Sequence, residues 1–209
     1  MSHQGLHIDH VIYGVVDIDA AAERLRRDHG LGSLPSGVLG GGTTNRMVPL
    51  EPPAFLELLG VADPEQPDGA WLSQTLGGED RVLWWCLGVD DIDAAADRCG
   101  IPVQGGQMPM VDGPPRFFRT AGMPQYPFPF FISFDMDAEE RLDLRRAQYR
   151  EAAHDCEPGG YTYVEVGDTP EMLASRLGEH DLPVQHVPGA PVGIRACGIA
   201  TDRGEIELR

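Results

Sequence analysis

The chain contains no lysine, because all 16 of its basic residues are arginine. A phosphate-binding P-loop lysine, a Schiff base with pyridoxal phosphate and a lysine general base are therefore excluded. Cysteine is also scarce, and none of the residues forms a C-x-x-C pair: Cys86, Cys99, Cys156 and Cys197. Scattered cysteines in a chain of 209 residues are typical of reduced thiols rather than of a disulfide framework.

Long apolar runs are missing as well. No segment approaches the roughly 18 apolar residues of a membrane span, and the first residues lack the order of a signal peptide. We therefore expect a cytoplasmic protein. Acidic residues outnumber basic ones by 33 to 16, which gives a formal net charge of −17. Because this charge repels phosphate backbones and anionic lipid surfaces, we expect neither nucleic acid nor membrane as a partner.

The chain contains an internal repeat. Residues 17–24 read DIDAAAER and residues 91–98 read DIDAAADR, an offset of 74 residues, and each follows an apolar segment. A weaker third copy begins at Tyr161 and continues through Asp168. In each copy a β-branched and aromatic strand leads to an aspartate that can cap a short helix, and short extended segments follow.

This order predicts an α+β fold of repeated βαβββ modules. We expect two modules at 6–60 and 81–135, a linker at 61–80, a partly helical linker at 136–159 and a partial third module at 160–209. One such module cannot bury both faces of its sheet. We therefore expect the modules to pair into a curved mixed sheet around a cup, with the helices outside.

The motifs of the first module resemble a known superfamily. The segment IDHVI at 8–12, the glycine-rich turn that begins at Gly41 and the segment FLELL at 55–59 are similar to glyoxalase-like domains of the vicinal oxygen chelate (glyoxalase/bleomycin resistance/dioxygenase) superfamily. The resemblance implies a divalent metal in the cup, held by His and Glu from first and last strands, with Fe, Mn, Ni or Zn as candidates. His10 and Glu57 match those positions and are our candidate metal ligands and catalytic residues.

The second module departs from the family pattern. A shift of 74 residues takes His10 to Trp84 and Glu57 to Phe131, neither of which binds a metal. The metal site is therefore incomplete, and the protein could instead work without a metal. Glu207 in the third module is a further candidate ligand, since its spacing after Asp168 mirrors that of Glu57 after Asp17.

Strand alternation predicts which side chains accompany His10. It places Ile8 and Ile12 on the same face as His10, and Asp9 and Val11 on the opposite face. A His/Glu pair that faces a cup can also transfer protons without a metal, because one group can orient the other.

The candidate substrate-binding residues come from several segments. Asn45 follows the glycine turn and can hydrogen-bond a ligand, and Arg116 can bind a carboxylate. The second module is rich in aromatic residues, so Trp84 and Phe131 are candidates for an apolar pocket wall. Each of these residues could equally serve the turn, the surface or the core.

Two functions remain open. The first is a small-molecule enzyme that resembles the lyases, isomerases and dioxygenases of the superfamily, with an unknown substrate. The alternative is a metal-free binding protein that resembles the drug-sequestering, bleomycin-resistance members, which are acidic dimers with aromatic clefts. In both cases we expect a small-molecule ligand and a homodimer.

Overall fold

The computed structural model describes residues 5–36, 39–110, 114–123, 128–167 and 170–209. The first repeat comprises β1 (His7–Val15), α1 (Ile18–His29), β2 (Leu34–Pro35), β3 (Thr43–Pro49) and β4 (Phe55–Val61). The second comprises β5 (Arg81–Gly88), α3 (Ile92–Cys99), β6 (Val103–Met108), β7 (Arg116–Ala121) and β8 (Phe130–Phe134). The last segment comprises β9 (Pro158–Val166), α5 (Pro170–Leu177), β10 (Val184–His186), β11 (Ile194–Thr201) and β12 (Gly204–Leu208).

The repeated aspartates start equivalent helices. Asp17 accepts backbone N–H bonds at the start of α1, and Asp91 does the same for α3. Each helix ends at a glycine in the left-handed conformation, Gly30 with φ 77° and Gly100 with φ 64°. The aspartate that we expected to cap the third helix, Asp168, lies outside the described residues.

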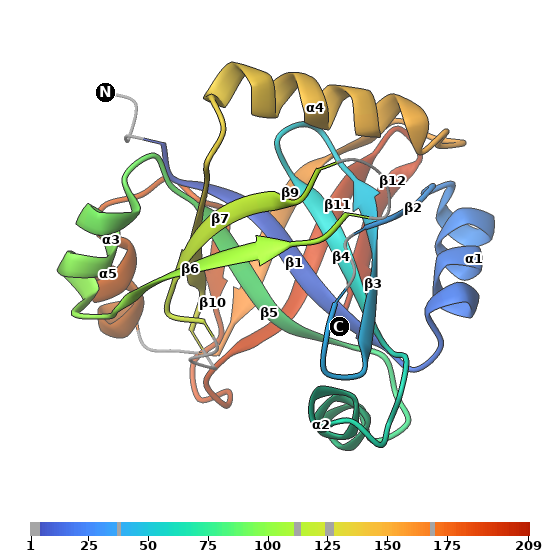
Figure 1. Ribbon diagram of the computed structural model, residues 1–209, viewed down its shortest axis with the longest axis horizontal. Coiled ribbons are helices and arrows are strands. Elements are labelled where there is room, and N and C mark those ends of the chain that lie inside the picture. Colours follow the sequence, from blue (N-terminus) through green and yellow to red (C-terminus); the bar gives the residue numbers. More distant parts are fainter. Residues whose placement is uncertain (1–4, 37–38, 111–113, 124–127, 168–169) are drawn as a thin grey trace.

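The two repeats form one strongly curled sheet of eight strands in the order β2-β3-β4-β1-β5-β8-β7-β6 (Figure 1). Within each repeat the first and last strands pair in parallel, β1 with β4 and β5 with β8. The two repeats meet where β1 and β5 pair antiparallel at the centre. The predicted α+β fold with a curved mixed sheet is confirmed.

A β-bulge interrupts the alternation of β1. Ile8 lies opposite Leu87 and His10 lies opposite Cys86, so Asp9 is an extra residue between two consecutive partners. Ile8 consequently packs in the same core as Val11, while the Asp9 side chain reaches His10. Our expectation that Ile8 shares the face of His10 and that Asp9 lies opposite is wrong, because a bulge shifts the pleat by one residue.

The last segment forms a separate four-stranded sheet in the order β10-β9-β11-β12. Its first strand, β9, pairs with β10 and β11. In the first two repeats, by contrast, the first strand pairs with the last strand of the same repeat. Apolar side chains of this sheet, such as Val164 and Ile199, pack in one core with residues of the large sheet, such as Val11 and Trp85.

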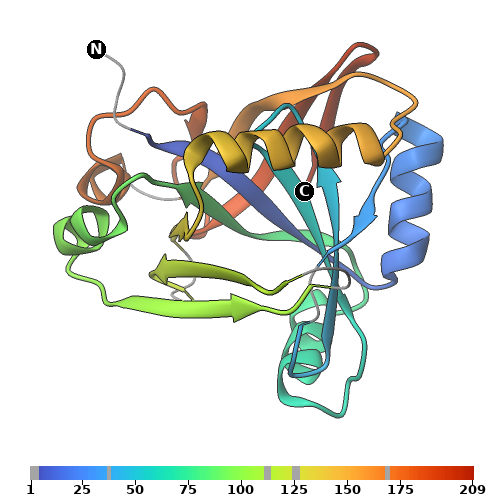
Figure 2. The same cartoon turned by 45° about the horizontal axis from the view of Figure 1, so that its top comes forward.

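Both segments expected as linkers contain a helix. Residues 61–80 include α2 (Pro67–Leu76), whose Leu72 and Leu76 are buried. Residues 136–159 include α4 (Ala138–Glu151), which Asp137 caps. Helix α4 crosses over the strands of the first repeat (Figure 2), and the one residue that it buries is Arg145. In the described part of the chain, no helix has the length and apolarity that a membrane crossing requires.

Candidate active site

His10 and Glu57 lie on neighbouring parallel strands, where Glu57 pairs with Ile12 and His10 pairs with Phe55. Their side chains meet, since Nε2 of His10 is 3.6 Å from Oε2 of Glu57. The His10 side chain is 6% exposed and the Glu57 side chain 15%. The structure thus brings together the two residues that we expected to share a site.

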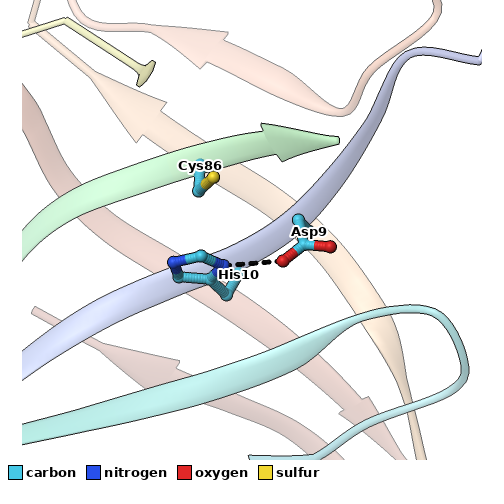
Figure 3. Close-up of side chains that lie close together, drawn as sticks. All are labelled: Asp9, His10 and Cys86. Carbon is cyan, nitrogen blue, oxygen red and sulfur yellow. Dashed lines mark hydrogen bonds and ion pairs between the residues drawn. The ribbon is translucent and has the colours of Figure 1, made fainter. Parts of the chain in front are cut away.

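Asp9 holds the other nitrogen of the His10 ring. Its Oδ1 atom lies 2.8 Å from Nδ1 of His10 (Figure 3), and the Asp9 side chain is fully buried. Burial opposes ionisation of Asp9, but the hydrogen bond to His10 and the positive charges around it hold its pKa well below the ordinary value. Because a carboxylate only accepts, Nδ1 of His10 carries the proton and Nε2 is left facing Glu57.

Asn45 fixes the position of Glu57. Its amide Nδ2 donates to Oε1 of Glu57 over 3.0 Å, which leaves Oε2 for the His10 side. The other amide atom, Oδ1, is buried without a hydrogen-bond partner. A buried acceptor beside a carboxylate is a place where a ligand hydroxyl or N–H can bind.

Two aromatic rings hold the imidazole of His10. The Phe55 ring stacks on it with centroids 4.6 Å apart, and the Phe130 ring meets it edge-on at 5.7 Å. Phe130 pairs with Cys86 as Glu57 pairs with Ile12, so Phe130 is the counterpart of Glu57. The expectation that Phe131 faces the cup is wrong, because Phe131 is fully buried in the core between the sheets.

Trp84 lies on the face of the large sheet that carries Ile12, and its ring stacks on Trp71 of α2 at 5.0 Å. Trp71 is 41% exposed. The pair therefore forms an aromatic surface beside the apolar side chains of that face, and a role of Trp84 in ligand binding stays a prediction.

Glu207 is not brought to His10. It is an exposed residue of β12 that accepts hydrogen bonds from Tyr163 and Arg209. The expectation that it adds a ligand to the site fails because the last segment has a different strand order from the first two repeats.

The last segment reaches the site through Tyr161 instead. The buried Tyr161 hydroxyl accepts the N–H of Val11 at 3.0 Å and donates to the carbonyl of Phe55 at 2.7 Å. It thereby bridges β1 and β4 beside His10. Burial raises its pKa well above the ordinary value, so the hydroxyl keeps the proton that it donates.

Arginines surround Asp9 on the side away from His10. Arg141 of α4 pairs with Oδ2 of Asp9, and Nη2 of Arg145 lies 4.0 Å from Oδ1. With Arg116 of β7 they line a small hollow that opens to solvent, together with Phe134, Met136 and Leu144. Arg116 was a candidate from the sequence. Asp9, Arg141 and Arg145 were missed, although the spacing of the two arginines on one helix face was visible.

The described residues contain one group of three candidate metal donors, Asp9, His10 and Cys86, whose ligand atoms lie within 4.8 Å of one another. Burial and the charges of Asp9 and Glu57 raise the pKa of the Cys86 thiol well above its ordinary value. Of the three predicted ligands, His10, Glu57 and Glu207, only His10 belongs to this group.

Residues 8–172 match the family model for the glyoxalase-like domain. Among solved structures, a hypothetical protein from Staphylococcus aureus is similar over 98% of this chain and 99% of its own, with 14% identity and a TM-score of 0.68. A methylmalonyl-CoA epimerase from Streptomyces coelicolor covers 60% of this chain and 92% of its own, with 22% identity and a TM-score of 0.45. No curated protein sequence matches. At these identities the structural likenesses show the fold alone.

Proposed function

This chain belongs to the glyoxalase-like domain family of the vicinal oxygen chelate superfamily, and we propose that it is an enzyme that moves a proton on a small organic substrate. The class is that of isomerases and lyases, with His10 and Glu57 as the acid–base pair. The observation that carries the proposal is the chain of contacts from Asp9 to His10 to Glu57, which leaves Nε2 of His10 facing a carboxylate at 3.6 Å.

Each residue has a defined task in this reaction. Nε2 of His10 takes a proton from a substrate carbon beside a carbonyl group, and Asp9 stabilises the imidazolium that forms. Asn45 holds Glu57 so that Oε2 can accept or return a proton within the same site. Return of the proton to another atom gives an isomer, and loss of a leaving group gives a lyase product. Neither outcome needs an added oxidant or reductant.

The donor atoms do not fit the divalent metal that the superfamily resemblance implies. Arg141 and His10 already bind the Asp9 carboxylate, so a metal there would lie beside a guanidinium group. Burial and the charges of Asp9 and Glu57 raise the pKa of the Cys86 thiol, so a metal there would have to displace its proton. The second repeat supplies Trp84 and Phe130 where ligands would be needed. We therefore derive the reaction from side chains alone.

The test is hydrogen exchange with solvent. Purified protein is incubated in D₂O with a panel of ketones, 2-oxo acids and acyl thioesters, and proton NMR follows the signals next to each carbonyl. We expect at least one compound to exchange. His10→Gln and Glu57→Gln should each slow the exchange by about 100-fold or more, the usual contribution of a positioned acid or base.

Matched controls separate chemistry from folding. Glu57→Gln keeps the shape that Asn45 contacts, and Asp93→Asn removes an exposed carboxylate that pairs with Arg119 at the surface. Exchange that is unchanged in both His10→Gln and Glu57→Gln contradicts the proposal. Exchange that appears only after a divalent metal is added contradicts its metal-free form.

A binding function is the second candidate, and the partly exposed Trp71–Trp84 pair favours it, since stacked indoles suit a flat ligand. Under that function, aromatic cations bind and no compound exchanges. The homodimer and the cytoplasmic location remain predictions, which gel filtration with light scattering and cell fractionation can check.

A further inference from the structure

Where α4 packs on the large sheet, arginine side chains outnumber the carboxylates that face them. Arg116, Arg141 and Arg145 line one hollow, and Asp9 is the carboxylate that pairs with two of them. Among the described residues, Arg116 has no ion-pair partner. The chain as a whole has a net charge of −17, whereas this hollow has an excess of positive charge. Such an excess is costly unless an anion reduces it.

The guanidinium groups are desolvated, which strengthens their attraction for an anion. Arg145 is 4% exposed, and burial together with the neighbouring arginines lowers its pKa to about 10 despite the charge of Asp9. Burial also lowers the pKa of the half-buried Arg116. The Nε atoms of Arg141 and Arg145 are buried without hydrogen-bond partners. Unused donors and uncompensated charge thus occur at the same place.

We propose that this hollow binds the carboxylate of a small organic acid, with Arg116 as the residue that supplies the free guanidinium. The other walls are apolar, Phe134, Met136 and Leu144, so they favour a carboxylate attached to a short hydrocarbon chain over inorganic phosphate. Arg141 already binds the Asp9 carboxylate here, which shows that the local geometry suits this group.

The hollow is connected to the acid–base pair through Asp9, which pairs with Arg141 and orients His10. Asp9 contacts Arg141 with one oxygen and His10 with the other, and the Phe55 ring packs against both Arg145 and the imidazole, with its centroid 4.3 Å and 4.6 Å from them. The identification of the acid as a substrate rests on the proposed function, whereas the binding site does not. The proposed function and the proposed binding site together make the substrate an organic acid whose carboxylate binds in the hollow beside α4.

The experiment measures binding by isothermal titration calorimetry, with hexanoate as the probe. Inorganic phosphate and hexylamine serve as comparison ligands at the same ionic strength. We expect hexanoate to bind, hexylamine not to bind, and phosphate to bind at least tenfold more weakly. Arg116→Gln should weaken hexanoate at least tenfold. This variant leaves no carboxylate without a partner, and its melting temperature verifies the fold.

Arg119→Gln is the matched control, because Arg119 lies on the same strand but pairs with Asp93 at the surface. Its hexanoate affinity should equal that of the wild type. Absence of hexanoate binding, or equal affinities in wild type and Arg116→Gln, overturns the site. Phosphate that binds as tightly as hexanoate overturns its assignment to carboxylates. His10→Gln should keep hexanoate binding, so failure of the proton-transfer function and failure of this site give different results.

Discussion

Asp9 and His10 are neighbours in the chain, and the Asp9 carboxylate nevertheless lies 2.8 Å from Nδ1 of the His10 ring. Side chains of consecutive strand residues normally point to opposite faces. The β-bulge at Asp9 removes this separation, so a two-residue segment supplies both the imidazole and the carboxylate that orients it. Bulges are frequent beside active sites for this reason.

Replacement of Asp9 by asparagine should destabilise the protein and loosen α4. The substitution leaves Arg141 and the buried Arg145 without their counter-charge, and breaking one side of a buried ion pair costs about 3–5 kcal/mol. Urea unfolding measures the loss. Hydrogen exchange by mass spectrometry should show faster exchange in α4, because Arg145 is the one residue that this helix buries fully. Asp93→Asn, which breaks an exposed ion pair, is the control and should change the free energy of unfolding little.

Replacement of Tyr161 by phenylalanine should destabilise the strands around His10. The hydroxyl satisfies the N–H of Val11 and the carbonyl of Phe55, and buried backbone groups without partners cost about 1–3 kcal/mol. Chemical denaturation gives the change in the free energy of unfolding. Tyr163→Phe, on the same strand, removes an exposed bond to Glu207 and should have a smaller effect. Equal effects of the two substitutions would show that the bridge between β1 and β4 adds nothing.

The repeat made the large sheet predictable. Octapeptides that agree at seven of eight positions predict the same strand and helix in both halves, and two such units with a glycine stop after each helix have few ways to pair. His10 and Glu57 were predictable as neighbours, because the resemblance places them on first and last strands, which pair in parallel. The contact of His10 with Asp9 was not predictable, because a bulge depends on the register with β5 and leaves no mark in the amino-acid sequence of β1.

Strand register, which the sequence does not reveal, also explains the error at Phe131. The repeat offset is 74 residues at the helix caps, but the register of β8 against β5 makes Phe130 the residue equivalent to Glu57. One residue of difference in loop length moves a side chain to the other face of the sheet. The arginines of α4 were hidden for another reason: a charged helix reads as a solvated surface until the buried Asp9 that it covers is known.

Metal content should distinguish the acid–base site from a metal site. We expect inductively coupled plasma mass spectrometry to find only trace Fe, Mn, Ni and Zn in the purified protein, and we expect added zinc to leave the melting temperature unchanged. The reason is that Arg141 and His10 already bind the Asp9 carboxylate and that a metal would have to displace the proton of the buried Cys86 thiol. One equivalent of metal that is lost in both His10→Ala and Cys86→Ala would show that the donor group is a metal site after all.

Acid should weaken the contact between α1 and the end of α4 through His154. Its Nδ1 atom accepts the backbone N–H of Gly32 at 2.9 Å, which requires an unprotonated nitrogen. Burial and the nearby charge of Arg26 lower the pKa of His154, and a hydrogen bond to the Pro49 backbone and the charge of Asp155 oppose them only in part. The unfolded chain therefore takes up a proton near pH 6.5 while the folded protein resists it, so stability is present above this pH and falls as the pH is lowered through it.

The measurement compares the free energy of unfolding at pH 7.5 and pH 5.5 in the wild type and in His154→Gln. Glutamine offers a side-chain oxygen to the Gly32 N–H but does not titrate. We expect the difference between the two pH values to shrink in the variant, because one of the groups that bind protons more readily in the unfolded chain has been removed. An undiminished difference in His154→Gln would mean that other groups account for the acid sensitivity. His154 would then be only a structural hydrogen-bond acceptor.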